Sequence, residues 1–403
     1  MLNTESSKKT AAKDMPFILG RINDVLAVVC ICTLVAWNVD MGILFVVQMA
    51  FFVSTILYSY ISNRKLSAIC VWAVLFYGYC VLSIMWAYDE AEALKYLVTM
   101  IKTAFLVIFI SLYANGMREV NIILKSIIAG AVILTILLLF YTPLGEWGSE
   151  RLGAEFGMNQ NEVGMIYVLG AALCLHYSRK NSLFILLFAA FVVISMFTGS
   201  RTSFLLMLLL IFSLILTRIK KPSDLLYIIP FGLLIFALIF LSMNNELLYN
   251  VLGVRMEGLF NILSGEGKVD SSAMKRMLFI EIGIEWFFEN AIIGYGLNSF
   301  KSMNKLSGYS HNNYIELLVN FGLIGAIIYY SLPVITLIKS VHIWINKQKD
   351  ALLPILLIII VLISDIGSVS YYTAIIITSL TISYRMTALA DMPTEEKPEQ
   401  AVA

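Results

Sequence analysis

The sequence predicts an all-α fold: a polytopic helical membrane protein with about twelve transmembrane helices and one large, partly helical extracytoplasmic loop. Of its 403 residues, 60% are hydrophobic and only 14% are charged, whereas a soluble domain carries about 25% charged residues. Apolar runs of roughly 20 residues, long enough to cross a bilayer, recur along the chain. The net charge is only +1, and no basic stripe is present, so nothing favours binding of nucleic acid.

Twelve apolar runs define the expected helices. They occupy residues 22–38, 41–61, 68–87, 96–114, 121–141, 160–178, 182–199, 202–217, 224–243, 315–339, 351–365 and 368–387. The expected organisation is a cytoplasmic tail (1–21), nine transmembrane helices (22–243), a large extracytoplasmic loop (244–310), three transmembrane helices (311–388) and a cytoplasmic tail (389–403). Because no small-residue cleavage site follows the first apolar run, we expect the polar N-terminus to be retained.

The distribution of Lys and Arg predicts the orientation. If the N-terminus is cytoplasmic, 18 of the 28 Lys and Arg residues fall in cytoplasmic segments. Six of the other ten lie in the long loop, and long loops translocate largely regardless of their charge. Four remain in short outer segments: Lys95, Lys102, Arg151 and Arg201. The bias predicts that both termini lie in the cytoplasm and that the long loop lies outside.

The long loop is expected to be partly helical. The segments LLYNVLGVRMEGLFNIL and SSAMKRMLFIEIGIEWFFEN both space their large apolar residues as a helix does. Trp286, Phe287 and Phe288 suit a helix that lies at the membrane surface. Gly294 and Gly296 are expected to end this helix and turn the chain.

Only one of the three histidines falls on the predicted outer side. His311 stands at the mouth of the helix after the long loop, in GYSHNNYIELLVNFGLIG. Ser310 can cap this helix, which would place His311 in its first turn. The same start of the helix supplies further candidate substrate-binding residues: Asn312, Asn313, Tyr314 and Glu316. This segment is either ordinary polar capping at an interface or a site in which the imidazole acts as a general base.

Four arginines on the predicted outer side form a second group of candidates. Arg151 and Arg201 persist in short outer segments against the positive-inside tendency, and Arg255 and Arg276 lie in the long loop. A guanidinium presents a planar fork of donors that matches phosphate oxygens, so the four could clamp a pyrophosphate. Alternatively, each could pair with a carboxylate nearby in the sequence: Glu146, Glu150, Glu155 or Glu257.

Two asparagines form a third group. Asn159 and Asn161, with Glu162, open a helix on the same outer side in GMNQNEVGMIY. Helix N-termini favour anions, and amides can hydrogen-bond to sugar hydroxyls, although structural capping explains these residues equally well. Asp365 is a charge in an apolar stretch, for which we expect an interfacial position near the outer end of its helix.

Absent motifs narrow the chemistry. The chain has no P-loop, no GxGxxG beside a strand and no D-x-D, so a metal-dependent enzyme that uses a nucleotide sugar has little support. The five cysteines sit inside apolar runs without metal-binding spacing, and we expect no disulfide between them. No metal and no cofactor is indicated.

Three stretches carry a resemblance to a known family. They are GYGLNSFKSMNKLSGYSHNNYIELLVNFGLIG at 294–325, Ser200-Arg201 at the head of a short helix, and Asn159-Gln160-Asn161, with Gln160 where the family usually has proline. With these motifs the chain resembles the O-antigen polymerase and O-antigen ligase superfamily of bacterial membrane glycosyltransferases. The resemblance, which extends to the topology, covers nearly the whole chain.

The resemblance implies a metal-independent, inverting glycosyl transfer at the outer face of the bacterial inner membrane. The donor would be an oligosaccharide linked to undecaprenyl pyrophosphate. Arg201 and Arg276 would contact the pyrophosphate, Arg151 and Arg255 would assist, and His311 would bind or deprotonate the acceptor hydroxyl. A protein that regulates chain length would be a partner, and the product would be O-antigen of lipopolysaccharide, capsule or exopolysaccharide.

Two distinctions stay open at this point. The Asn159–Asn161 segment and the H-N-N-Y-I-E-L run look more like polymerases, which extend a lipid-linked glycan, than like ligases, which transfer it to lipid A core. A membrane transporter is the alternative of another class. Against transport, the charged candidates gather at one face and not at the midplane of the membrane.

Overall fold

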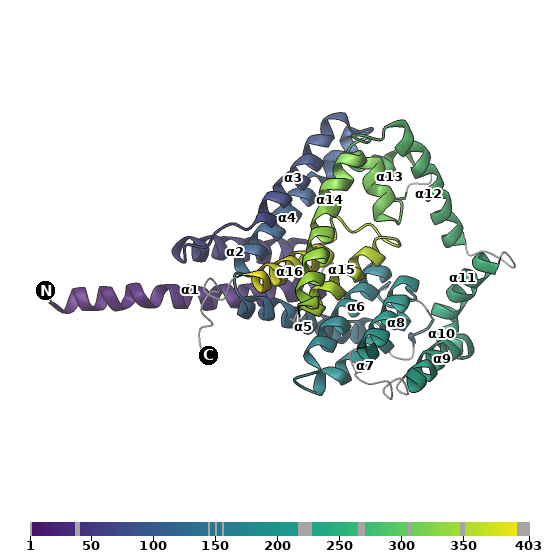
Figure 1. Cartoon of the computed structure of the whole chain (residues 1–403), viewed down its shortest axis with the longest axis horizontal. Coiled ribbons are helices and arrows are strands. Elements are labelled where there is room, and N and C mark those ends of the chain that lie inside the picture. The colour runs from purple at the N-terminus through teal and green to yellow at the C-terminus, as the bar shows by residue number, and fades with distance from the viewer. Residues whose placement is uncertain are drawn as a thin grey trace.

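The computed structural model describes residues 2–36, 41–143, 146–149, 151–154, 157–216, 228–264, 271–304, 308–346 and 351–392. The elements in these ranges are helical (Figure 1). Before the long loop they are α1 (Leu2–Ala36), α2 (Met41–Ile61), α3 (Ala68–Leu82), η1 (Ser83–Trp86), α4 (Glu90–Tyr113), α5 (Met117–Tyr141), α6 (Gln160–Tyr177), α7 (Leu183–Phe197), α8 (Arg201–Leu216) and α9 (Ile228–Asn244). From the long loop onward they are α10 (Glu246–Leu248), η4 (Tyr249–Gly253), α11 (Val254–Ser264), α12 (Ser271–Glu289), α13 (Ser299–Met303), α14 (Asn313–Ile345), α15 (Leu352–Ser364) and α16 (Ala374–Asp391).

The polytopic helical class is confirmed, and each predicted apolar run coincides with a helix. Six described helices are long and apolar enough to cross a membrane, or seven if Phe236–Asn244 and Glu246–Gly258, which are bent by 87° to each other, are counted as one span. The spans are Pro16–Ala36, Gly42–Ile61, Ala68–Trp86, Glu90–Tyr113, Met117–Tyr141 and Asn313–Ile345. The apolar helices α7, α8 and α15 are shorter than these spans. A helix of 15 residues is only about 22 Å long at ~1.5 Å per residue, less than the thickness of the hydrocarbon core. The predicted number of twelve spans is therefore not confirmed.

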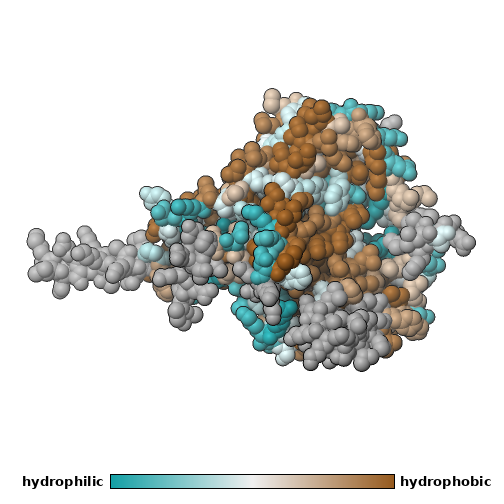
Figure 2. Space-filling model, viewed as in Figure 1, coloured by the Kyte–Doolittle hydropathy of each residue, from teal (hydrophilic) through white to brown (hydrophobic). Residues whose placement is uncertain are grey.

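Apolar side chains cover much of the outside of the molecule. Figure 2 shows them as brown patches over the helical body. On α3, for example, Val71, Val74 and Leu75 are each about 60% exposed, while Phe76 and Tyr77 on the other face of the helix are buried. Helices with one face packed and one apolar face exposed are what a lipid environment accepts.

Ion pairs close one end of the bundle. Arg118, at the start of α5, pairs with Asp24 of α1 and with Glu119. Arg64, after α2, lies 3.6 Å from Glu119, and Arg385 of α16 donates from Nε to the carbonyl of Ala114 at 2.8 Å. Each of these arginines, all predicted to be cytoplasmic, has a carboxylate or a carbonyl of a neighbouring segment beside it.

The two segments of the long loop with helical spacing are helical, as predicted: the first forms α10, η4 and α11, and the second forms α12. Figure 1 shows α11 and α12 along one edge of the molecule, between the α9–α10 corner and the start of α14. Gly294 and Gly296 then turn the chain, with φ angles of +67° and +90°. A Cβ on Gly296 would lie 2.5 Å from the Ser83 carbonyl oxygen, so only glycine permits this close approach.

The turn after α12 supplies hydrogen-bond partners for backbone groups at a break in α14. Gly322, inside α14, has a φ of +61°, which interrupts the helix. Backbone groups near the break bond instead to the turn: Leu323 N–H donates to the Ala291 carbonyl at 2.8 Å, and the Asn320 carbonyl accepts from Gly296 N–H at 2.7 Å. Because buried backbone groups without partners are costly in a membrane protein, this exchange makes the break tolerable. It also fixes the long loop to α14.

We predict that Gly322→Ala destabilises the protein by at least about 1–3 kcal/mol, because alanine is strained at this φ. The added Cβ would also lie 2.3 Å from the Ile292 carbonyl oxygen. The matched control is Gly78→Ala on α3, where nothing lies within 4 Å of the added Cβ. Thermal unfolding in detergent measures both, and equal melting temperatures would contradict this account of the break.

Candidate functional site

A polar cavity brings together residues that are far apart in the sequence. It has a volume of about 460 Å³, within the range of roughly 300–1,000 Å³ that ligand pockets have. The residues that line it are Arg151, Ala154, Gly157, Met158, Asn159, Gln160, Asn161, Arg255, Ser272, Arg276, Tyr309 and His311. They come from the segment before α6, from α11 and α12, and from the segment before α14. Six of the predicted site residues therefore meet here.

Arg151 is held by oxygen atoms of neutral groups. Its Nε donates to the Thr198 carbonyl at 2.8 Å, and its two terminal nitrogens donate to Asn161 Oδ1 at 2.9 Å and to Gln160 Oε1 at 3.4 Å. Gly199 allows the approach, because a Cβ at its φ of +59° would lie 3.1 Å from the arginine Nε. None of these partners is a carboxylate, so they do not neutralise the positive charge of Arg151 beside the cavity.

The four predicted arginines form one group, here called the arginine cluster: Arg151, Arg201, Arg255 and Arg276. Burial, and after it the charges of Arg255, Arg276 and Arg201 in that order, together lower the pKa of Arg151 to about 10. Arg201 begins α8, as predicted for the head of a short helix, but does not itself line the cavity. An anion placed beside Arg151 would favour its charged form.

The loop after α15 joins Arg276 to the start of α8. A Cβ on Gly367 would lie 2.5 Å from the Thr202 hydroxyl oxygen and 3.8 Å from a terminal nitrogen of Arg276. Arg276 of α12 and Thr202 of α8 thus approach the same glycine from two sides. Glycine at this position lets the long loop and the transmembrane core meet at the arginine cluster.

His311 adopts a backbone conformation that few residues other than glycine adopt. Its φ is +56°, one of three positive values at non-glycine residues in the described chain, and such strain is often found at functional sites. The imidazole lies parallel to Phe279, with ring centroids 6.5 Å apart, and 4.2 Å from the ring of Tyr309. Its Nδ1 is buried and has no hydrogen-bond partner among the described residues.

The surroundings of His311 favour the neutral imidazole. Burial lowers its pKa to about 4, and the positive charge of Arg276 contributes in the same direction. A neutral imidazole has one nitrogen available to accept a proton. The arrangement therefore provides a proton acceptor beside a site for an anion.

The predicted capping of α14 needs a correction. The N-cap is Asn312 and not Ser310, because the Asn312 side chain accepts from Ile315 N–H at 3.1 Å. Ser310 instead donates its hydroxyl to the Asn312 carbonyl at 2.7 Å. His311 precedes the helix and is not in its first turn, since its left-handed backbone cannot continue into an α-helix.

The other predicted residues of this segment lie behind the cavity wall. Glu316 is 2% exposed and accepts from Ser310 N–H at 2.8 Å. The Tyr314 hydroxyl donates to the Leu362 carbonyl at 2.9 Å. Asn312, Asn313, Tyr314 and Glu316 are absent from the cavity lining. Their contacts hold the loop that carries His311 in place.

Asp365 lies at the end of α15, as expected, and its side chain is buried. It is 0% exposed and accepts hydrogen bonds from Asn313 Nδ2 at 3.1 Å, from the Tyr330 hydroxyl at 3.0 Å and from the Ser370 hydroxyl. Asn313 in turn accepts from the backbone N–H groups of Ser370 and Tyr371 at 2.9 and 3.2 Å. These bonds tie the start of α14 to the loop between α15 and α16.

Three polar lining residues were not predicted as site residues: Gln160, Ser272 and Tyr309. Tyr309 stands two residues before His311 in the same G-Y-S-H run, and this closeness was the available signal. Gln160 holds Arg151, a contact between segments that a local pattern does not reveal. In the described part of the chain, no group of three or more His, Cys, Asp or Glu side chains could hold a metal ion.

We predict that Asn313→Ala lowers stability, because the substitution leaves the buried N–H groups of Ser370 and Tyr371 without their acceptor. Each buried group left unsatisfied costs about 1–3 kcal/mol. The control is Asn346→Ala at the exposed end of α14, where the side chain contacts only His342 in the described chain. Melting temperatures in detergent compare the two, and an equal small effect would show that the network contributes little.

Comparison with known proteins bears on the family. Residues 184–330 match the family model described as O-antigen ligase. No curated protein matches the chain. The matched range includes Arg201, Arg255, Arg276 and His311. With the H-N-N-Y, S-R and N-Q-N motifs, this match supports the superfamily of O-antigen ligases and O-antigen polymerases as the family of this chain.

Proposed function

We propose that the protein is a metal-independent, inverting glycosyltransferase that polymerises a lipid-linked glycan. It transfers a growing chain from undecaprenyl pyrophosphate onto another lipid-linked repeat unit. The reaction takes place at the outer face of the bacterial inner membrane, with both termini in the cytoplasm and twelve membrane passes. The Lys and Arg distribution and the O-antigen ligase match support this placement.

The observation that carries the proposal is the arginine cluster, three members of which line one polar cavity. Arg151, Arg255 and Arg276 line it together with the amides of Asn159, Gln160 and Asn161. A diphosphate presents oxygen atoms that match the planar donor groups of these guanidiniums, and their positive charges attract it. Because the diphosphate leaves with additional negative charge, the same arginines stabilise the transition state more than the bound donor.

His311 completes the proposed reaction. The acceptor hydroxyl oxygen attacks the anomeric carbon of the donor sugar from the face opposite the diphosphate, and a carbon–oxygen bond forms. The bond from the anomeric carbon to the diphosphate oxygen breaks, and its electron pair leaves with the lipid diphosphate. His311 accepts the proton of the acceptor hydroxyl. A bound diphosphate raises the pKa of His311, because its charge opposes that of Arg276, and this makes the imidazole a stronger base.

A ligase is the second candidate. The match to residues 184–330 carries the description O-antigen ligase and so favours transfer to lipid A core or a similar acceptor. The Asn159-Gln160-Asn161 segment favours a polymerase. In the structure Asn159 caps α6, and Asn161 binds Arg151 at 2.9 Å. This segment thus supports the arginine cluster under either activity, and the acceptor decides between them.

We predict that His311→Ala and Arg276→Ala each reduce glycosyl transfer by about 10²–10³-fold or more, as expected for loss of a group that acts in the transition state. The assay uses purified protein with an undecaprenyl-pyrophosphate repeat unit, with and without lipid A core, and products are separated on a gel. The control is Lys275→Ala, an exposed cation next to Arg276 on α12 that does not line the cavity.

Each result of this assay has a distinct meaning. A ladder from the repeat unit alone, lost in both variants and kept in the control, supports a polymerase with this site. Transfer that requires lipid A core supports the ligase. Full activity in both variants would show that the site is wrong. No transfer by folded wild-type protein supplied with its own repeat unit would favour transport.

We predict an unusually low acid limb in the pH profile of kcat/KM, which reports the free enzyme. The pKa of His311 is about 4 instead of 6.5, so the base stays neutral and active until the pH approaches 4. Arg276→Gln removes a positive charge beside the imidazole, which favours its protonated form and moves the limb to higher pH. A limb near 6.5 in the wild type, or one unmoved by Arg276→Gln, would contradict this assignment.

A further inference from the structure

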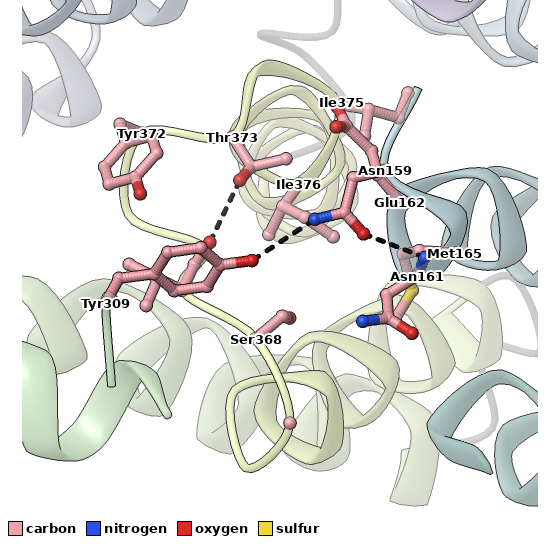
Figure 3. Close-up of a pocket in the computed structure, with 12 residues that line it drawn as sticks. Asn159, Asn161, Glu162, Met165, Tyr309, Ser368, Tyr372, Thr373, Ile375 and Ile376 are labelled. Carbon is pink, nitrogen blue, oxygen red and sulfur yellow. Dashed lines mark hydrogen bonds between the residues drawn. The ribbon is translucent and has the colours of Figure 1, made fainter. Parts of the chain in front are cut away.

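A second cavity adjoins the first. It has a volume of about 190 Å³. Its lining residues come from the start of α6, from the loop between α15 and α16, and from Tyr309: Asn159, Asn161, Glu162, Met165, Tyr309, Gly367, Ser368, Val369, Tyr372, Thr373, Ile375 and Ile376. Figure 3 shows this cavity, here called the Tyr309 pocket.

A hydrogen bond between two side chains divides the two cavities. Asn159 Nδ2 donates to the Tyr309 hydroxyl at 3.2 Å, and Figure 3 shows the two side chains meeting from opposite sides. Asn159, Asn161 and Tyr309 line both cavities. The ring of Tyr309 also lies 4.2 Å from that of His311. The Tyr309 side chain therefore contacts both the pocket and the proposed base.

The loop between α15 and α16 is a wall shared with the arginine cluster. Gly367 lines the Tyr309 pocket, and the position of a Cβ on it lies 3.8 Å from a terminal nitrogen of Arg276. Ser370 donates from its backbone N–H to Asn313 Oδ1 and from its hydroxyl to Asp365, and the bond to Asn313 holds this loop against α14. These contacts thus fix the position of the Tyr309 pocket beside both His311 and Arg276.

The chemistry of the two cavities differs. The Tyr309 pocket has no Lys, Arg or His among its described lining residues, and it carries the carboxylate of Glu162. The hydroxyls of Ser368, Tyr372 and Thr373 and the amides of Asn159 and Asn161 alternate with apolar side chains such as Met165 and Ile376. A diphosphate is disfavoured here by the carboxylate. A neutral ring with many hydroxyls and an apolar face fits this mixture of groups.

We propose that the Tyr309 pocket binds the terminal sugar of the acceptor glycan. This inference rests on the proposed function and adds to it the place of the second substrate. The carboxylate of Glu162 and the hydroxyl of Tyr372 hydrogen-bond to hydroxyls of that sugar. The attacking hydroxyl passes the Asn159–Tyr309 contact toward His311, while the donor diphosphate lies at the arginine cluster. The two substrates therefore meet at the shared wall.

The test separates the two substrates. The acceptor probe is the repeat oligosaccharide released from its lipid by mild acid and labelled at the reducing end. Without a diphosphate it can accept a glycan but cannot donate one. Initial rates are measured in nanodiscs against acceptor at saturating donor, and against donor at saturating acceptor. The variants are Glu162→Gln and Tyr372→Phe, and the matched control is Glu285→Gln, an exposed carboxylate on α12.

We expect each variant to raise the acceptor KM about tenfold, as for the loss of one hydrogen bond to a sugar hydroxyl. The donor KM and the melting temperature should stay at the values of the control. A raised donor KM with an unchanged acceptor KM would overturn the inference and place the donor glycan in the pocket. Unchanged KM values in both variants, with or without a lower kcat, would also overturn it.

A binding measurement keeps this inference separate from the proposed function. Fluorescence anisotropy of the labelled oligosaccharide is measured with wild type, Glu162→Gln and Glu285→Gln, without any donor. Binding weakened by Glu162→Gln alone supports the pocket even if the wild type transfers no glycan, a result that would defeat the glycosyltransferase proposal only. Equal binding to all three proteins, or no binding to the wild type, would overturn the pocket.

Discussion

Positive charge gathered beside a partly buried cavity is the constraint on which the candidate site depends. Arg151 is partly buried, its pKa is lowered to about 10 by burial and by three other arginines, and its described partners are all neutral oxygens. Such an arrangement costs free energy in the absence of an anion. Hydrogen bonds from Arg151 to acceptors in the α7–α8 turn and at the start of α6 offset part of this free energy. An anion is then the natural ligand of the cavity.

At the opposite end of the bundle, arginines form ion pairs with carboxylates of neighbouring helices. Arg118 has the carboxylates of Asp24 and Glu119 beside it, and Glu119 also lies 3.6 Å from Arg64. These pairs connect α1, α2 and α5 and need no ligand. α5 runs from this end toward Arg151, and its 25 residues correspond to roughly 37 Å of helix. Arginines at one end of the bundle thus form ion pairs between helices, whereas arginines at the other end line a cavity.

Two interruptions of regular structure bring the parts of the site together. The break at Gly322 lets the turn after α12 bond into α14, which anchors the helix that carries Arg276. The left-handed conformation of His311 ends the loop just before α14 and keeps the imidazole against Tyr309 and Phe279. Both strained positions are supported by buried hydrogen bonds nearby, of which those of Asn313 and Glu316 are the most extensive.

The amino-acid sequence by itself determined the helices and the residue types of the site. Apolar runs and helical spacing depend on neighbours along the chain, so even the helices of the long loop could be predicted. Arg151 and Arg276 could be predicted as candidates because they lie on the predicted outer side, and His311 because it begins the H-N-N-Y run. Only the tertiary structure decided that Asn313 and Glu316 support the loop, that Asp365 is buried, and that a second pocket opens beside Tyr309. These outcomes depend on contacts between segments as distant as α6, α12 and the α15–α16 loop, and no local pattern encodes such contacts.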